Sequence, residues 1–280
     1  MASASEAPGA RAQPDFALQA FVEGDGSPLV MLGGGTFGAV GFAPHAQVLA
    51  RDFRVVRLQT LNVERGQKHQ FLPPGYSVKL ESAAMTQALD LLNIRGAVDL
   101  VGWSFGGVVA LDFALDHPDR VHTLALSEPP AFWAVAPEEL RATPDMRAMC
   151  ELGKELDPET EPTDAQYVRF LCALGNCGAK PPVVGQPGWQ EWVTRRSAMR
   201  GLSVVPNHTD STARLKAFRR PVLIMTGADT VAFHRRINDI LAANFPIAER
   251  VELAGGHTAP VTAREDFVAK LRAFLMRHRD

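Results

Sequence analysis

The chain has 280 residues, 46% of them hydrophobic, and carries 29 Lys and Arg against 31 Asp and Glu, a formal net charge of −2 at pH 7. This balance gives no basis for binding nucleic acid or an anionic membrane, and the length suffices for one domain with a large core. No stretch approaches the roughly 18 uninterrupted apolar residues that a membrane helix needs. We expect a soluble, cytoplasmic protein with a small-molecule substrate, and the sequence leaves a homodimer open.

The first segment, residues 1–15, is rich in Ala, Ser, Pro and Gly and contains no apolar core. Such a composition cannot bury enough apolar surface to fold, and it lacks the apolar stretch of a signal peptide or membrane anchor. It therefore predicts a disordered leader.

Strand and helix patterns alternate along the rest of the chain. We expect strands at 16–22, 28–32, 53–58, 97–101, 121–126, 221–225 and 250–253, and helices at 39–50, 78–92, 107–116, 235–243 and 264–278. The first two strands have a hairpin-like spacing, and the second ends in three glycines. Such alternation predicts a mostly parallel sheet with helices on both faces.

The strand at 97–101 runs through Gly102-Trp103-Ser104-Phe105-Gly106 directly into an Ala-rich helix. This context indicates a nucleophile elbow, in which a tight turn lifts the serine hydroxyl clear of the sheet and needs small residues on either side. The first amides of the helix then face whatever the hydroxyl attacks. The alternative is an ordinary Gly/Ser turn, but the flanking strand and helix favour Ser104 as a nucleophile.

A serine hydroxyl needs a base to remove its proton as it attacks. Among eight histidines, His257 is the candidate, because it lies in Gly255-Gly256-His257-Thr258 between the last strand and the final helix. His234, which follows the strand at 221–225, is considered a substrate contact only. The other histidines suit solvated or core positions.

The order of these elements and the elbow resemble the α/β-hydrolase superfamily, in its serine-nucleophile branch, over about residues 16–278. The resemblance implies an eight-stranded, mostly parallel α/β sheet with a helical lid inserted after strand 6. It divides the chain into a core, residues 16–128 and 220–280, and a lid, residues 129–219. It also implies a catalytic histidine at the position of His257.

The residue that orients the base is open between two carboxylates. The family commonly has an aspartate three residues after the glycine that follows the strand at 221–225, whereas this chain has Asp229 two residues after Gly227 and Thr230 in the expected position. A second location known in the superfamily, the end of the preceding strand, holds Glu128 here. We favour Glu128 over Asp229. Glu128 together with the Gly-Ala-x-Thr turn resembles zearalenone-type lactonases.

An oxyanion formed during attack needs hydrogen-bond donors. The backbone N–H of Phe105 is one. The loop after the strand at 28–32 supplies the other, where residues 33–36, Gly-Gly-Gly-Thr, replace the His-Gly pair usual in the family; Gly34 takes the position of the family's glycine, and Gly35 is the expected donor. A plain flexible turn is the alternative. The glycines do not match a phosphate-binding loop, because no Gly-Lys-Ser/Thr follows them.

About ninety residues, 129–219, separate two core strands, far more than a simple connection needs. Helical patterns at 137–156, 164–174 and 189–199, separated by Pro- and Gly-rich breaks, predict a lid. Phe132 and Trp133 are the best candidates to line a substrate pocket, with Trp103 beside the nucleophile. Trp189 and Trp192 lie behind them, where packing of the lid on the core is the role that we favour.

Three cysteines, Cys150, Cys172 and Cys177, lie in this same region. Their odd number, without metal-ligand spacing, fits a reducing compartment. Cys172 and Cys177 could pair if oxidised, but we expect small buried apolar side chains.

The resemblance implies hydrolysis through an acyl-enzyme on serine, without a metal or organic cofactor. Carboxylester or lactone hydrolysis ranks first, hydrolysis of a carbon–carbon bond in a diketone second, and cofactor-free perhydrolysis third. A different class, a non-catalytic ligand-binding receptor with this fold, also stays open. The irregular acid motif keeps it open, as does the segment 59–66, which replaces the Asp-x-x-Gly usual in the family.

Overall fold

The computed structural model describes residues 16–279, so the leader expected at residues 1–15 lies outside the described part. Seven strands form one sheet in the order β1-β3-β2-β4-β5-β6-β7, and all neighbours are parallel except β1 and β3. The strands are β1 (Gln19–Glu23), β2 (Ser27–Leu32), β3 (Phe53–Gln59), β4 (Val98–Trp103), β5 (Val121–Ser127), β6 (Val222–Gly227) and β7 (Ala248–Leu253). The predicted α/β class with a mostly parallel sheet is confirmed.

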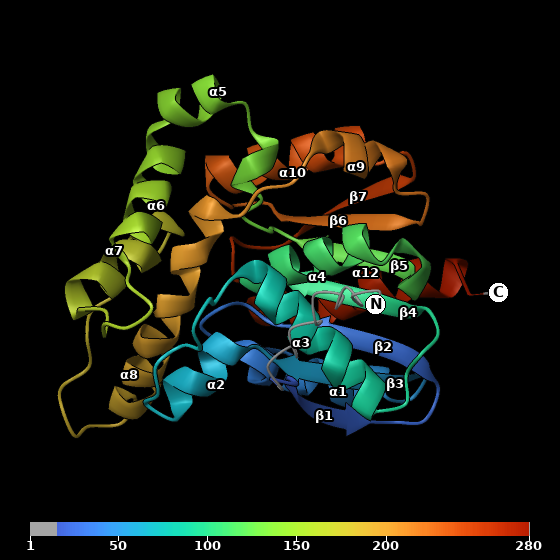
Figure 1. The fold of residues 1–280 in the computed structure, drawn as a ribbon, viewed down its shortest axis with the longest axis horizontal. Helices are drawn as coiled ribbons and strands as arrows, with labels where there is room; N and C mark the ends of the chain where they lie inside the picture. Colours follow the sequence, from blue (N-terminus) through green and yellow to red (C-terminus); the bar gives the residue numbers. More distant parts are fainter. Residues whose placement is uncertain (1–15, 280) are drawn as a thin grey trace, which may run out of the picture.

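Helices follow most strands, as expected (Figure 1). Those of the core are α1 (Ala43–Leu49), α2 (Leu61–Gln67), α3 (Val78–Leu91), α4 (Phe105–Asp116), α10 (Ala232–Asn244), α11 (Ala259–Thr262) and α12 (Arg264–Arg277). The segment expected as one helix at 39–50 is instead a 3₁₀ turn, Gly38–Phe42, followed by α1. Helix α2 was not predicted.

The expected number of eight strands is wrong for the described residues. That number came from the resemblance, whereas the sequence has seven segments with a strand pattern, and the long insertion follows the fifth. The hairpin-like start is also wrong, because β1 pairs with β3 rather than with β2. The last four residues of β2 are fully buried and require a neighbour on each side, whereas β1 is largely exposed and suits an edge.

Alternating side chains of the strands enter two cores, one on each face of the sheet. In β2, Val30 and Leu32 pack into the core that includes side chains of α3 and α4, whereas Leu29 and Met31 pack into the core that includes Phe267 of α12. This follows from the two-residue period of a strand. Burial on both faces fixes the register, and with it the positions of the strand ends where the site forms.

The insertion between β5 and β6 contains α5 (Pro137–Ala142), α6 (Pro144–Glu155), α7 (Asp164–Ala173), α8 (Trp189–Ala198) and α9 (Thr212–Ala217). Figure 1 shows α5 to α8 gathered at one end of the sheet, the end toward which β5 leads. The single helix expected at 137–156 is two helices. Pro144 causes the break, because proline disfavours a helical conformation in the residue before it.

The structure joins Cys172 and Cys177 in a disulfide, which corrects their expected role as buried apolar groups. Cys172 is half-buried and Cys177 is exposed, whereas Cys150 is buried and free. The chain reverses direction after α7, where the Asn176 N–H donates to the Leu171 carbonyl and Gly175 has a φ of 93°. This turn brings the second cysteine back beside the first, which spacing alone did not reveal.

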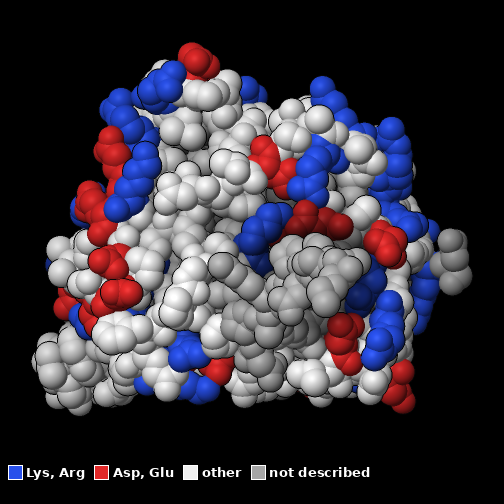
Figure 2. All heavy atoms as spheres, in the orientation of Figure 1, with Lys and Arg blue, Asp and Glu red and all other residues white. Residues whose placement is uncertain are grey.

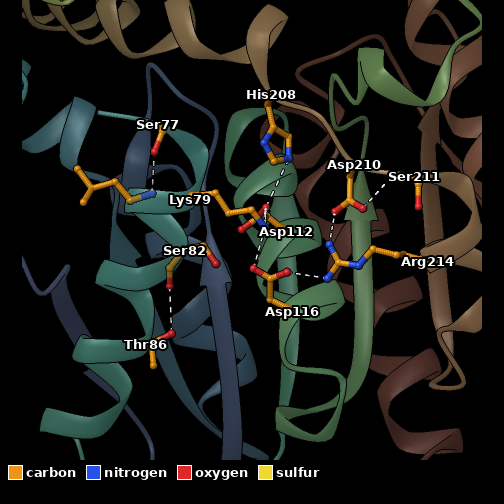
Figure 3. Close-up of polar contacts among 11 residues, drawn as sticks. Ser77, Lys79, Ser82, Thr86, Asp112, Asp116, His208, Asp210, Ser211 and Arg214 are labelled. Atoms are coloured by element: carbon orange, nitrogen blue, oxygen red, sulfur yellow. Dashed lines mark hydrogen bonds and ion pairs between the residues drawn. The ribbon is translucent and has the colours of Figure 1, made fainter. Parts of the chain in front are cut away.

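A polar cluster, which we call the tether, links the end of the insertion to helices α3 and α4 (Figure 3). The ammonium group of Lys79 on α3 lies 2.7 Å from carboxylate oxygens of both Asp112 and Asp116 on α4. Arg214 on α9 contacts Asp116 at 2.6 Å and Asp210 at 2.8 Å. The Asp112 side chain is fully buried, so its charge depends on these neighbours.

On the face shown in Figure 2, Lys and Arg side chains lie among Asp and Glu. Within the insertion, several basic side chains form ion pairs with acidic ones, such as Arg169 with Glu155 at 2.7 Å. Within residues 16–279, none of the helices combines the length and apolar character needed to span a bilayer.

Candidate active site

The predicted elbow lies between β4 and α4. Ser104 has φ 54° and ψ −123°, a backbone conformation that costs a non-glycine residue about 1–3 kcal/mol. A Cβ at Gly102 would lie 2.5 Å from the Gly107 Cα, and one at Gly106 would lie 2.4 Å from the Gly33 carbonyl oxygen. Both positions must therefore be glycine. The turn holds Ser104 at the N-terminus of α4, in the wall of a cavity.

His257 reaches Ser104 from the loop after β7. Its Nε2 lies 3.0 Å from the Ser104 Oγ, and its Nδ1 lies 2.7 Å from the Glu128 Oε2. Because a carboxylate only accepts, Nδ1 donates to Glu128, and Nε2 has a lone pair for the serine hydroxyl. The indole N–H of Trp103 also donates to the His257 carbonyl at 3.0 Å, which fixes the backbone of the loop.

Glu128 follows β5 and has a φ of 47°. Its side chain is 1% exposed. One oxygen accepts the Gly227 N–H at 2.7 Å, and the other accepts the Thr230 hydroxyl at 2.8 Å as well as the His257 ring. Three donors thus compensate the loss of water around a buried carboxylate.

Thr230 occupies the position where the family commonly has its aspartate, and it donates a hydrogen bond to Glu128. Asp229 lies in the cavity wall. Among residues 16–279, the described hydrogen bonds of the His257 ring go to Glu128 and Ser104, and none goes to Asp229. The structure therefore brings Ser104, His257 and Glu128 together, and leaves Asp229 beside them.

The glycine loop approaches the elbow closely, since a Cβ at Gly35 would lie 2.8 Å from the Phe105 Cβ. The Gly34 carbonyl accepts the N–H groups of Phe37 and Gly38 at 2.9 and 2.8 Å. Because a trans peptide is planar, the Gly35 N–H points away from that turn. Gly34 and Gly35 both line the cavity beside Ser104, next to the first residue of α4.

Two residues that the sequence did not single out hold this loop in place. The Asn62 side chain donates to the Gly35 carbonyl at 2.7 Å and to the Ala198 carbonyl of α8 at 2.8 Å. Glu81 in turn accepts the N–H groups of Leu61 and Asn62, and burial raises its pKa to about 7. The sequence did offer one signal for Asn62, because it lies in segment 59–66, which departs from the Asp-x-x-Gly usual in the family. The residues of this segment matched no motif that would have identified Asn62.

The cavity above Ser104 has a volume of about 710 Å³ and lies between the core and the insertion. Its wall includes Gly34, Trp103, Ser104, His234 and His257 from the core, and Phe132, Leu152, Tyr167, Phe170, Trp192 and Arg195 from the insertion. Most of these side chains are apolar or aromatic, which suits a small and largely apolar ligand.

The predicted pocket aromatics divide into two groups. Trp103 and Phe132 lie in the cavity wall, whereas Trp133 and Trp189 do not. Trp133 packs against the core instead. Trp189 begins α8, and Trp192, one turn later, lies in the cavity wall with Glu191 and Arg195 of the same helix. The Trp192 ring also packs edge-on against Tyr167, with centroids 4.7 Å apart, so it combines a place in the cavity wall with packing inside the insertion.

Within residues 16–279, one group of side chains is close enough together to hold a metal ion. It consists of the buried residues Glu128, His234 and His257. The two imidazole rings are stacked, with centroids 4.1 Å apart and planes 7° apart. An ion bound in the plane of one ring lies well outside the plane of the other, so both cannot ligate it in this arrangement. The geometry suits a hydrogen-bonding site better than a metal site.

Comparisons with known proteins agree with this architecture. The family model for the alpha/beta hydrolase fold matches residues 27–263. RutD of Caulobacter vibrioides, named as a proposed carbamate hydrolase, is 27% identical over 262 residues, which cover 89% of this chain and 91% of RutD. The esterase of Thermogutta terrifontis superposes with a TM-score of 0.70 at 18% identity, covering 94% of each chain. The enol-lactonase of Burkholderia xenovorans LB400 gives 0.60 at 20% identity, covering 92% of this chain and 96% of that one.

Proposed function

The chain belongs to the α/β-hydrolase fold family, and on that basis we propose that it is a serine-dependent hydrolase of carboxylic esters or lactones. The observation that carries the proposal is the continuous hydrogen-bonded chain from Ser104 through His257 to Glu128, at the wall of an apolar cavity. This arrangement contains a nucleophile, a base and an acid that orients the base.

In the proposed reaction, the Ser104 Oγ attacks the carbonyl carbon of the substrate and its proton passes to the His257 Nε2. Glu128 stabilises the imidazolium that forms, and the N–H groups of Phe105 and Gly35 bind the oxyanion. The imidazolium then gives its proton to the leaving alcohol. Water, activated by the same histidine, releases the acid from Ser104.

The insertion, residues 129–219, acts as a lid in this proposal. It supplies most of the residues of the cavity wall, including Phe132, Trp192 and Arg195. The Arg195 guanidinium lies 4.0 Å from the centroid of the Phe37 ring, so the insertion contacts the core across the cavity. A lid of this kind excludes water and selects the substrate by shape.

Carbamates are a second substrate class, favoured by the RutD relatives, which align over about nine-tenths of both chains. A carbamate presents a similar carbonyl to the same serine. A comparison of matched p-nitrophenyl esters and carbamates separates the two classes.

Hydrolysis of p-nitrophenyl butanoate by the purified protein and by Ser104→Ala tests the proposal. We expect turnover in the wild type and a loss on the order of 10⁴-fold or more in the variant. Thermal unfolding of both proteins checks that the variant is folded. Turnover that survives in Ser104→Ala, or a wild type that binds ligands but cleaves no carbonyl substrate, contradicts the proposal and favours a binding protein with this fold.

A further inference from the structure

His234 is a buried polar residue that the proposed reaction does not use. It is the third residue of α10, is 1% exposed and lies in the cavity wall. Neither of its ring nitrogens has a hydrogen-bond partner in the described part of the chain. A buried polar group without a partner is costly, and a ligand in the cavity that His234 lines can supply that partner.

The ring cannot readily turn elsewhere. It stacks on His257 with centroids 4.1 Å apart, and the Phe233 ring lies against it with the same separation. In the proposed reaction, the His257 Nε2 protonates the leaving oxygen. The alcohol portion of the substrate therefore lies against His257, about one ring spacing from His234.

The surroundings of His234 favour an uncharged ligand group. Burial, with a smaller contribution from His257, holds the pKa of His234 well below its usual value of 6.5. The Glu128 carboxylate belongs to the same cluster, within 4.8 Å. A neutral imidazole offers one donor and one acceptor, which matches a hydroxyl group. A carboxylate on the ligand would instead find no positive charge on the ring and would be repelled by the Glu128 carboxylate.

We infer that His234 binds a second hydroxyl group on the alcohol portion of the substrate, close to the ester oxygen. Monoesters of diols, and lactones with a hydroxyl near the ring oxygen, are the class that this site takes. A hydroxyl two carbons from the ester oxygen spans a distance comparable with the spacing of the two stacked rings. The inference deepens the proposed function and rests on it for the placement of the alcohol portion.

Binding to Ser104→Ala tests the site without cleavage. The probes are 2-hydroxyethyl butanoate and propyl butanoate, which have the same number of heavy atoms and differ in one hydroxyl, each titrated by NMR. We expect the hydroxyethyl ester to bind about tenfold tighter. In Ser104→Ala/His234→Phe, which keeps an aromatic ring but no nitrogens, the preference should disappear, and His234→Gln should restore part of it.

Two controls locate the hydroxyl. Asp229→Asn changes another polar residue of the cavity wall and should leave the preference unchanged. Propyl 3-hydroxybutanoate carries its hydroxyl on the acyl portion and should bind no better than propyl butanoate. Equal affinities for the two main probes, equal losses in His234→Phe, or a preference for the acyl-side hydroxyl would each overturn the inference.

The two proposals fail in different ways. If the wild type cleaves no ester but Ser104→Ala keeps the hydroxyl preference that depends on His234, the proposed reaction is wrong and the hydroxyl site stands. If esters are cleaved and the preference is absent, the reaction stands and the role of His234 is wrong.

Discussion

Acidic and basic groups lie at both ends of helix α4, but the groups differ in kind and in burial. At the N-terminal end, Glu128 accepts three hydrogen bonds from uncharged donors, and a positive partner arises only when His257 takes up a proton. At the C-terminal end, Asp112 and Asp116 face Lys79, whose charge is permanent at neutral pH. Glu128 is therefore suited to a partner whose charge changes during a reaction, whereas Asp112 and Asp116 have a permanently charged partner and stabilise the fold.

The helix dipole explains why the second end needs strong partners. The N-terminus of α4 carries partial positive charge, which favours the oxyanion expected beside Phe105. The C-terminus carries partial negative charge, which disfavours Asp112 and Asp116 there. Burial opposes the charge on Lys79, yet the two carboxylates outweigh it and raise the pKa of Lys79.

The largest effect is expected from Glu128→Gln, which keeps the shape of the N-terminal end but removes its charge. Turnover of p-nitrophenyl butanoate should fall on the order of 10⁴-fold, because the imidazolium loses its stabilising carboxylate. Asp229→Asn is the matched control and should change turnover little. A larger loss in Asp229→Asn than in Glu128→Gln would assign the acid to Asp229 instead.

The next largest effect is expected from Lys79→Met, which removes a cation from the C-terminal end of α4. It leaves the buried Asp112 carboxylate without its closest cation, at a cost of about 3 kcal/mol in the free energy of unfolding measured with urea. Turnover should stay close to that of the wild type. Lys79→Met/Asp112→Asn should recover part of the stability, since the uncompensated charge is gone; no recovery would mean that the tether does not depend on charge.

Ser77→Ala is expected to cost about 1 kcal/mol in the same unfolding measurement. The Ser77 hydroxyl oxygen accepts the Leu80 N–H at 3.1 Å and caps α3, the helix that carries Lys79 (Figure 3). Ser77→Asp keeps an acceptor and should remain close to the wild type. If both variants lose equal stability, the cap is not the cause.

The smallest effect concerns pH at the tether, where the His208 Nε2 lies 3.5 Å from the Asp112 Oδ1 (Figure 3). Burial lowers the pKa of His208, while Asp112, Asp210 and Asp116 raise it and Lys79 lowers it. Because the folded pKa lies below the unfolded value of 6.5, the unfolded chain takes up a proton first, and stability falls as the pH drops below that value. His208→Asn should flatten this part of a stability profile; an unchanged slope would exclude His208 as its source.

Local patterns predicted much of this molecule. The elbow was readable because strand, glycines and helix are consecutive, and the mostly parallel sheet followed from alternating strands and helices. The contact between Glu128 and His257 was not fixed by spacing, because it depends on two loops 129 residues apart meeting at the strand ends. From the sequence, Glu128 could be ranked above Asp229 as the acid that orients His257 only through the resemblance to the α/β-hydrolase superfamily.

The errors also have physical causes. An edge strand and a hairpin strand have the same local pattern, so the partner of β1 depended on which strand offered a free edge. Pro144 could be seen in the sequence, but the helical spacing of apolar residues on both sides of it led to the prediction of one continuous helix. Trp189 and Trp192 are three residues apart, and only the position of α8 against the core determines which of them reaches the cavity.

The side-chain amide of Asn62 has a practical consequence for protein engineering. One nitrogen holds both the glycine loop beside Ser104 and the last residue of α8. A library that varies α8 to change substrate preference will therefore also shift the Gly35 backbone, and selectivity and rate will change together. Variants from such a library need to be ranked by kcat and KM separately, and the positions of the insertion far from Ala198 are the better places to begin.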